Sequence, residues 1–167
     1  MLAARLIRLI EDHADSLTRE ALEDILTNPR TASFRTVPRN ELAPRVHALY
    51  QNLGNWIGDP GEDKVRQEYE AWGRTRFRQG ISLSEIVYTL ILAKHHLRQY
   101  IRDHGLVEYS GDRVVRGELL PVQMHGIQEL NTMVGEFFDR ALYYLARGYE
   151  SEAAAARGAA AQPRTPR

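Results

Sequence analysis

Apolar residues recur three and four positions apart along almost the whole chain, and this period constrains the fold more than any other feature. Such spacing places apolar side chains on one face of an α-helix, whereas a half-buried strand needs strict alternation. No segment of about four to eight residues shows convincing alternation. The sequence therefore predicts an all-α fold, a helical bundle that could be globin-like.

Proline, glycine and capping residues divide this pattern into five predicted helices, the last of which is long. Their approximate ranges are 2–27, 40–58, 60–79, 82–102 and a fifth helix that ends near residue 149. Pro121 lies within the last pattern and leaves the start of that helix open. We expect a loop over 28–39 that packs over one edge of the core through Phe34, and a flexible Ala/Arg/Pro-rich tail over 150–167.

Three polar residues have predicted structural roles near the start of the fourth helix. Ser82 and Glu85 have the spacing of a capping box, which would satisfy free backbone N–H groups at the helix start. Arg76 turns toward the apolar side of the third helix, and a partly buried guanidinium needs a carboxylate, a helix C-terminus or an anionic ligand as its partner. Glu85 lies just beyond the turn and is the expected partner.

The charges are balanced, with 22 Lys+Arg against 22 Asp+Glu spread evenly along the chain. Nucleic-acid and anionic-membrane binding require a concentrated basic face, so we expect neither partner. The chain has no cysteine, which excludes disulfides, thiolate metal sites and a cysteine nucleophile. The N-terminus lacks the features of a signal peptide, and uncharged runs such as 119–128 are about half the length needed to cross a bilayer. These features favour a cytoplasmic protein.

Motifs for catalysis and metal binding are absent from the sequence. No glutamate precedes a histidine by three residues, no two histidines are four residues apart, and there is no Gly-rich phosphate loop or G-x-S-x-G elbow. We therefore expect no catalytic residue, no metal site and no enzymatic activity.

His95 and His96 lie in the middle of the fourth predicted helix, and Tyr69 and Trp72 lie on the third. Together these four residues are the candidate lining of a ligand pocket, to which Trp56 and Tyr50 could add aromatic surface. An inward imidazole could serve as an axial haem ligand or as a pH-sensitive switch. The alternatives are an ordinary hydrogen-bonded histidine and an ordinary aromatic core, and no cofactor is our first expectation.

The last helix carries apolar residues around much of its circumference. Its two seams include Ile127, Leu130, Val134, Phe137, Phe138, Ala141 and Tyr144, with steps of three and four residues typical of a coiled coil. These residues could form a central core helix or an exposed interface. The late position and aromatic content favour an interface, and a parallel homodimer along 127–149 is the preferred interpretation.

One stretch resembles a known family. The segment 72–87, WGRTRFRQGISLSEIV, follows an amphipathic first helix and a Leu-x-x-x-Val-x-x-Leu-Tyr second helix. This combination resembles the RsbRD-type N-terminal domain, which precedes STAS domains in stressosome co-antagonists and kinase modules in sensor histidine kinases. The likeness covers about residues 3–147. It implies an all-helical sensory domain that dimerises, is related in shape to globins or bundles, usually lacks haem, and signals through its last helix.

No STAS or kinase segment and no phospho-acceptor motif follows the resembling region, so we expect a stand-alone sensor or an excised domain. The leading hypothesis is a non-enzymatic bacterial sensory and regulatory module over 1–149, which acts as a homodimer on a STAS- or kinase-type output protein. One alternative is a globin-like binder of haem or another small molecule that uses His95 or His96. Another is a helical adaptor that binds a partner helix through 137–149.

Overall fold

The computed structural model describes residues 2–58, 61–105 and 120–161. Over these ranges the chain forms α-helices and one 3-10 helix, with no strand. The all-α prediction and the long C-terminal helix are confirmed. The elements are α1 (Leu2–Asp12), α2 (Ala14–Thr27), η1 (Pro29–Thr36), α3 (Arg39–Gln51), α4 (Leu53–Ile57), α5 (Glu62–Arg78), α6 (Leu83–His104) and α7 (Leu120–Ala160).

Two of the five predicted helices are each divided in two. The first breaks at His13, between α1 and α2, and the second breaks at Asn52, between α3 and α4. At each break the side chain bonds a carbonyl four residues earlier: His13 Nδ1 lies 2.8 Å from Leu9 O, and Asn52 Nδ2 donates to Ala48 O at 3.0 Å. Such bonds compete with the helical backbone ladder, while the apolar period continues across the break.

The segment predicted as the loop 28–39 contains the 3-10 helix η1. The side chain of Asn28 begins it by accepting a hydrogen bond from Arg30 N at 3.0 Å, and Thr31 Oγ1 donates to Ile25 O at 2.6 Å. Phe34 is fully buried, which confirms that this segment covers an edge of the core.

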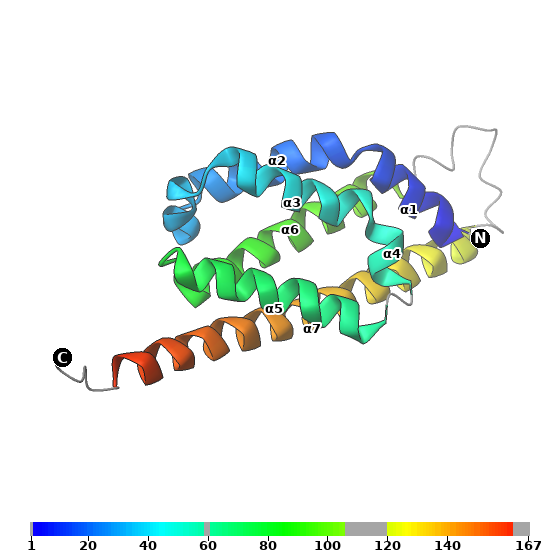
Figure 1. Ribbon diagram of the computed structural model, residues 1–167. Helices are drawn as coiled ribbons and strands as arrows, with labels where there is room; N and C mark the ends of the chain where they lie inside the picture. Colours follow the sequence, from blue (N-terminus) through cyan, green and yellow to red (C-terminus); the bar gives the residue numbers. More distant parts are fainter. Residues whose placement is uncertain (1, 59–60, 106–119, 162–167) are drawn as a thin grey trace, which may run out of the picture.

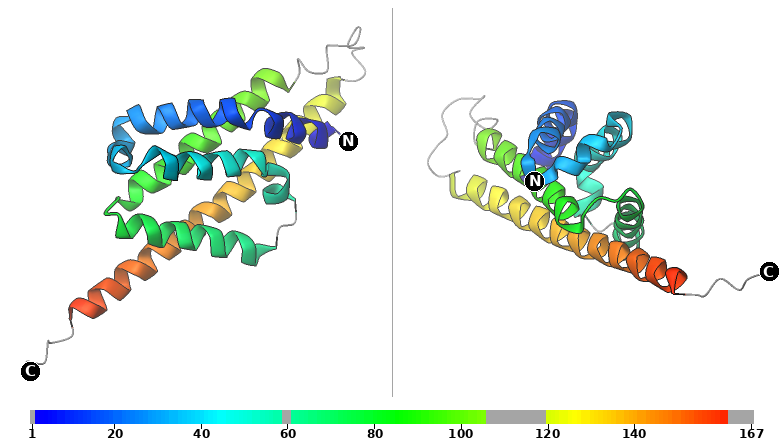
Figure 2. Two further views of the ribbon diagram at one scale, coloured as in Figure 1. Left: turned by 45° about the horizontal axis from the view of Figure 1, so that its top comes forward. Right: turned by 90° about the vertical axis from the view of Figure 1, so that its left-hand side faces the viewer.

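Helix α7 crosses the whole molecule and packs against α1, α4, α5 and α6 (Figures 1 and 2). Its C-terminal turns extend beyond the other helices and continue to Ala160, past the predicted end near Tyr149 (Figure 1). The run of alanines at 153–156 explains the extension, because alanine is the strongest helix former. No helix in the described ranges is both long enough and apolar enough to cross a bilayer.

The apolar seam of α7 lies in the core of the single chain. Leu130, Val134, Phe137, Phe138 and Ala141 are fully buried, Tyr144 is almost so, and Ile127 is partly buried. The Phe137 ring stacks on Trp56 of α4, with ring centroids 5.7 Å apart. The preferred assignment of this seam to a dimer interface is therefore corrected, because the chain's own helices already cover these side chains. These side chains belong to a central core helix, which was the alternative interpretation of the seam.

Candidate functional site

A cavity of about 380 Å³ lies between α3, α5 and α6. Its volume is in the lower part of the range for small-molecule pockets. Most of the lining is apolar and includes Ile25, Val46, Leu49, Trp56, Tyr69, Trp72, Leu90 and Ala93. Asn40, Glu41, Arg45 and Glu68 add polar groups. Because the Glu41, Arg45 and Glu68 side chains are more than a third exposed, this polar side forms the mouth of the cavity.

Three aromatic residues form one wall of the cavity, which we call the aromatic wall: Trp56, Tyr69 and Trp72. Tyr69 packs edge-on against both tryptophans, with centroid separations of 6.0 Å in each pair. Tyr69 also contacts Phe137 of α7 edge-on, at 5.9 Å. The wall therefore joins the cavity to the long C-terminal helix. Tyr50 lies nearby, but its hydroxyl donates to Ala93 O at 3.0 Å and its side chain is absent from the cavity lining.

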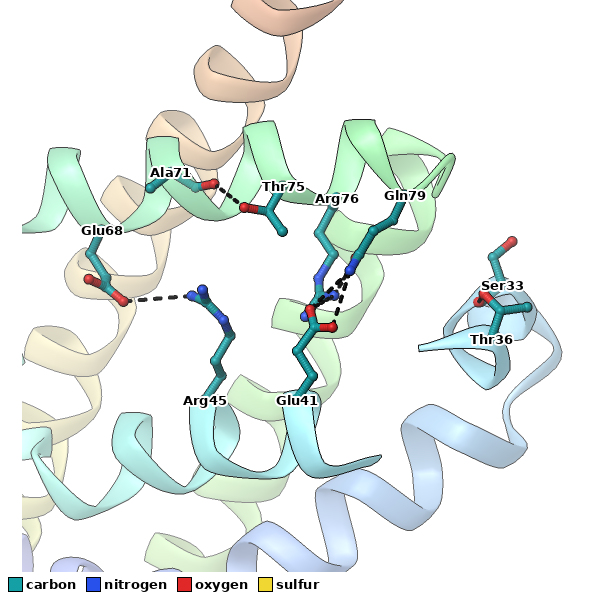
Figure 3. A network of polar contacts seen from close by, with 9 residues as sticks. All are labelled: Ser33, Thr36, Glu41, Arg45, Glu68, Ala71, Thr75, Arg76 and Gln79. Atoms are coloured by element: carbon teal, nitrogen blue, oxygen red, sulfur yellow. Dashed lines mark hydrogen bonds and ion pairs between the residues drawn. The ribbon is translucent and has the colours of Figure 1, made fainter. Parts of the chain in front are cut away.

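A buried arginine connects α5 to α3 beside the mouth (Figure 3). The side chain of Arg76 is 0% exposed, and its Nη1 donates to Glu41 Oε1 at 2.9 Å and to Gln79 Oε1 at 2.5 Å. Gln79 Nε2 also donates to Glu41 Oε1, at 3.0 Å. The guanidinium carbon lies 5.6 Å from the Phe34 ring centroid and 5.9 Å from that of Trp72.

These contacts shift the pKa values of both charged groups. The hydrogen bond from Gln79 lowers the pKa of Glu41, and the charge of Arg76 adds to this effect while partial burial opposes it. Burial lowers the pKa of Arg76, and the charge of Glu41 opposes that shift. Each group favours the charged form of the other, so the pair holds α3 against α5 as an ion pair.

The expected partner of Arg76, Glu85, is bound elsewhere. Glu85 Oε1 accepts a hydrogen bond from the backbone N–H of Ser33 in η1 at 2.9 Å, and Oε2 accepts from Ser82 Oγ at 3.1 Å. Glu85 thus ties η1 to the start of α6. The Ser82 side chain caps no backbone N–H of α6, so the Ser82 half of the predicted capping box does not form. The prediction that Arg76 is buried with a carboxylate is confirmed, but that carboxylate belongs to Glu41.

Only two of the four residues that were predicted to line a ligand pocket line this cavity. Tyr69 and Trp72 line the cavity, whereas His95 and His96 are not part of its lining. His95 is exposed, and His96 Nε2 lies 3.0 Å from Asp24 Oδ2 of α2. Within the described ranges, no group of three or more His, Asp or Glu side chains is arranged to hold a metal ion. Sequence reasoning did not single out Glu41, Arg45 and Glu68, which come from positions far apart in the chain.

Comparison with known proteins adds a family assignment. Residues 14–164 match the model of the family described as the RsbT co-antagonist protein rsbRD N-terminal domain. The chain belongs to this family. It is a family of stressosome-type signalling domains. No curated protein and no solved structure matches the chain. The matched range contains the whole cavity of this RsbRD-type domain.

In this RsbRD-type domain α5 and α7 touch through their backbones. A Cβ atom at Gly73 of α5 would lie 2.1 Å from Leu145 O, and one at Gly148 of α7 would lie 2.2 Å from Glu70 O. Real Cβ atoms essentially never approach other heavy atoms this closely, so glycine is required at both positions. Gly73 directly follows Trp72, which places the helix crossing immediately behind the aromatic wall.

Proposed function

We propose that this RsbRD-type domain is a non-enzymatic signal-receiving module whose input is a small molecule in the cavity. Its output is a change in α7 that a STAS- or kinase-type partner protein reads. One observation carries the proposal: Tyr69 and Trp72 line the cavity on the same stretch of α5 where Gly73 contacts the α7 backbone. A ligand that moves the aromatic wall therefore acts on the element that holds α7.

Filling the cavity tests this coupling. Val46 lines the cavity and is buried, so Val46→Phe adds a ring into the open space, whereas Val46→Ala enlarges it and is the matched control. We expect Val46→Phe to change amide hydrogen exchange in the C-terminal turns of α7, because the added ring displaces the aromatic wall. Val46→Ala should leave exchange in these turns at the wild-type rate. Unchanged α7 exchange in folded Val46→Phe would contradict the coupling.

The proposal includes a homodimer formed through a face other than the buried seam. Ile91 of α6 and Tyr143 of α7 are large apolar residues that are 44% and 60% exposed. Lys94 Nζ lies 3.3 Å from Asp139 Oδ1, and α6 and α7 run in opposite directions, so Ile91 and Tyr143 lie at the same level of the pair. Exposed apolar patches mark interaction surfaces, which supports a dimer contact here.

Sedimentation tests the dimer. The double variant Ile91→Lys and Tyr143→Glu should sediment as a monomer at concentrations where the wild type is a dimer, because it places charges in an apolar contact. Val122→Lys is the matched control, since Val122 is 61% exposed near the start of α7, far along the helix from Tyr143. A wild type that stays monomeric, or a double variant that stays dimeric, would show that this face is not the interface.

A further inference from the structure

We propose that the cavity binds a small monocarboxylic acid with an apolar body, its carboxylate held by Arg45 at the mouth and its body against the aromatic wall. This inference rests on the proposed function and adds the chemical class of the input. Three features of the cavity support it: the apolar interior, the cations already beside the tryptophan faces and the weakly held cation at the mouth.

The interior of the cavity selects an apolar ligand body. Ile25, Leu49 and Leu90 line the cavity together with the aromatic wall, and all three are buried. Removing apolar ligand surface from water into such a space is favourable in proportion to the area buried. The volume of about 380 Å³ accommodates a single ring or a medium-length alkyl chain with its head group at the mouth.

An aromatic wall could instead hold a cationic ligand through cation–π contacts. The tryptophan faces, however, already have cations of the protein beside them. Lys64 Nζ lies 5.5 Å from the Trp56 ring centroid, and the guanidinium carbon of Arg76 lies 5.9 Å from that of Trp72. A ligand ammonium group would be repelled by both charges. The wall therefore disfavours a cation.

Arg45 is the charged group at the mouth that is free to change partner. Its Nη1 lies 3.7 Å from Glu68 Oε1, and the two side chains are 38% and 58% exposed (Figure 3). Exposed pairs of this kind contribute little stability, so Glu68 can be displaced into solvent. Glu41 is already bound to Arg76 and Gln79 and is not displaced. A ligand carboxylate can then form a bidentate, charge-assisted hydrogen-bonded pair with the Arg45 guanidinium.

The chain contains only two tryptophans, and both belong to the aromatic wall, so intrinsic fluorescence reports on the cavity directly. The probes are octanoate, octan-1-ol and octylamine, which share one alkyl chain and differ in the head group. We expect a saturable fluorescence change with octanoate and at least tenfold weaker binding of octylamine. Val46→Phe, which fills the cavity, should abolish the octanoate response.

Variants separate the head-group contact from the apolar fit. Arg45→Gln should weaken octanoate binding about tenfold and leave octan-1-ol binding unchanged, because a charge-assisted hydrogen bond contributes at least that factor. Arg19→Gln, at an exposed position on α2 outside the cavity, is the matched control and should change neither. Thermal unfolding of each variant checks that it is folded.

Three results would overturn the inference: no saturable octanoate response, octylamine binding as tight as octanoate binding, or equal octanoate affinity in Arg45→Gln and wild type. The proposed function fails by a different measurement, the exchange of α7 amides in Val46→Phe. If octanoate does not bind while Val46→Phe still changes α7, the carboxylate assignment alone is wrong. If octanoate binds while Val46→Phe leaves α7 unchanged, the site stands and the coupling is wrong.

Discussion

Replacing Gly148 with alanine tests the backbone contact between α5 and α7. The added Cβ would lie 2.2 Å from Glu70 O, 2.6 Å from Glu70 Cα and 2.7 Å from Glu70 C. All three are backbone atoms of α5, so no side-chain rotation can relieve the overlap. Ordinary contact begins at 3.4 Å. The two helices must therefore separate by about 1 Å, the difference between these distances.

The net effect follows from two opposing contributions. Overpacking a well-packed interior costs about 1–3 kcal/mol, and a backbone overlap lies at the upper end of that range. Alanine also favours the helix over glycine by about 1 kcal/mol. We therefore expect Gly148→Ala to lower the free energy of unfolding by about 2 kcal/mol, which corresponds to roughly 4–8 °C in Tm for a domain of this size.

Urea denaturation followed by far-ultraviolet circular dichroism measures this difference. Gly135→Ala is the matched control on the same helix, because nothing lies within 4 Å of a Cβ at that position. It should raise the free energy of unfolding by up to about 1 kcal/mol through helix propensity alone. If Gly148→Ala unfolds at the same urea concentration as Gly135→Ala, the close approach of α5 and α7 is refuted.

Two further substitutions test the ion pair and the core. Glu41→Gln removes the anionic partner of buried Arg76 and should lower the free energy of unfolding by about 2 kcal/mol at neutral pH, in the range for hydrogen bonds to charged groups. Because the Gln79 hydrogen bond and the Arg76 charge lower the pKa of Glu41 on folding, the wild type should lose stability as the pH falls from the unfolded pKa of 4.5 through the lower folded value. Urea unfolding over this range should show a smaller pH dependence in Glu41→Gln, and equal slopes would contradict the assignment. Phe137→Asp buries a carboxylate in the core and should abolish helical circular dichroism, whereas folded Phe137→Asp monomers would contradict the burial of the α7 seam.

The helices were predictable because each buries one apolar face, and a buried helix face requires apolar residues three and four positions apart in the sequence. The breaks at His13 and Asn52 were not predictable in this way. Each depends on a side chain that bonds a carbonyl one turn earlier, and the apolar positions keep their spacing across the break. The extension of α7 beyond Tyr149 depends on helix propensity rather than on burial, so the apolar pattern ends before the helix does.

The aromatic part of the site was predictable, including Trp56 of α4, whereas the partners of the polar groups were not. Tyr69 and Trp72 share a face of α5, and both line the cavity. The partner of Arg76 depends instead on how α3 packs on α5, which places Glu41, and not the nearby Glu85, beside the guanidinium. The apolar seam of α7 could not be assigned from the sequence for a similar reason. Apolar residues recur every three or four positions whether the helix packs against its own chain or against a second chain. Only the packing of α4, α5 and α6 decides between these cases.

The glycine crossing determines how a movement of the aromatic wall reaches α7. Where helices meet through side chains, rotamer changes absorb small displacements. At Gly73 and Gly148 they meet through backbone atoms, and close-packed backbones transmit a displacement instead of absorbing it. Gly148→Ala and Val46→Phe should therefore act on the same contact, and their effects on α7 hydrogen exchange should not add. Additive effects would mean that the cavity and the crossing act on α7 independently.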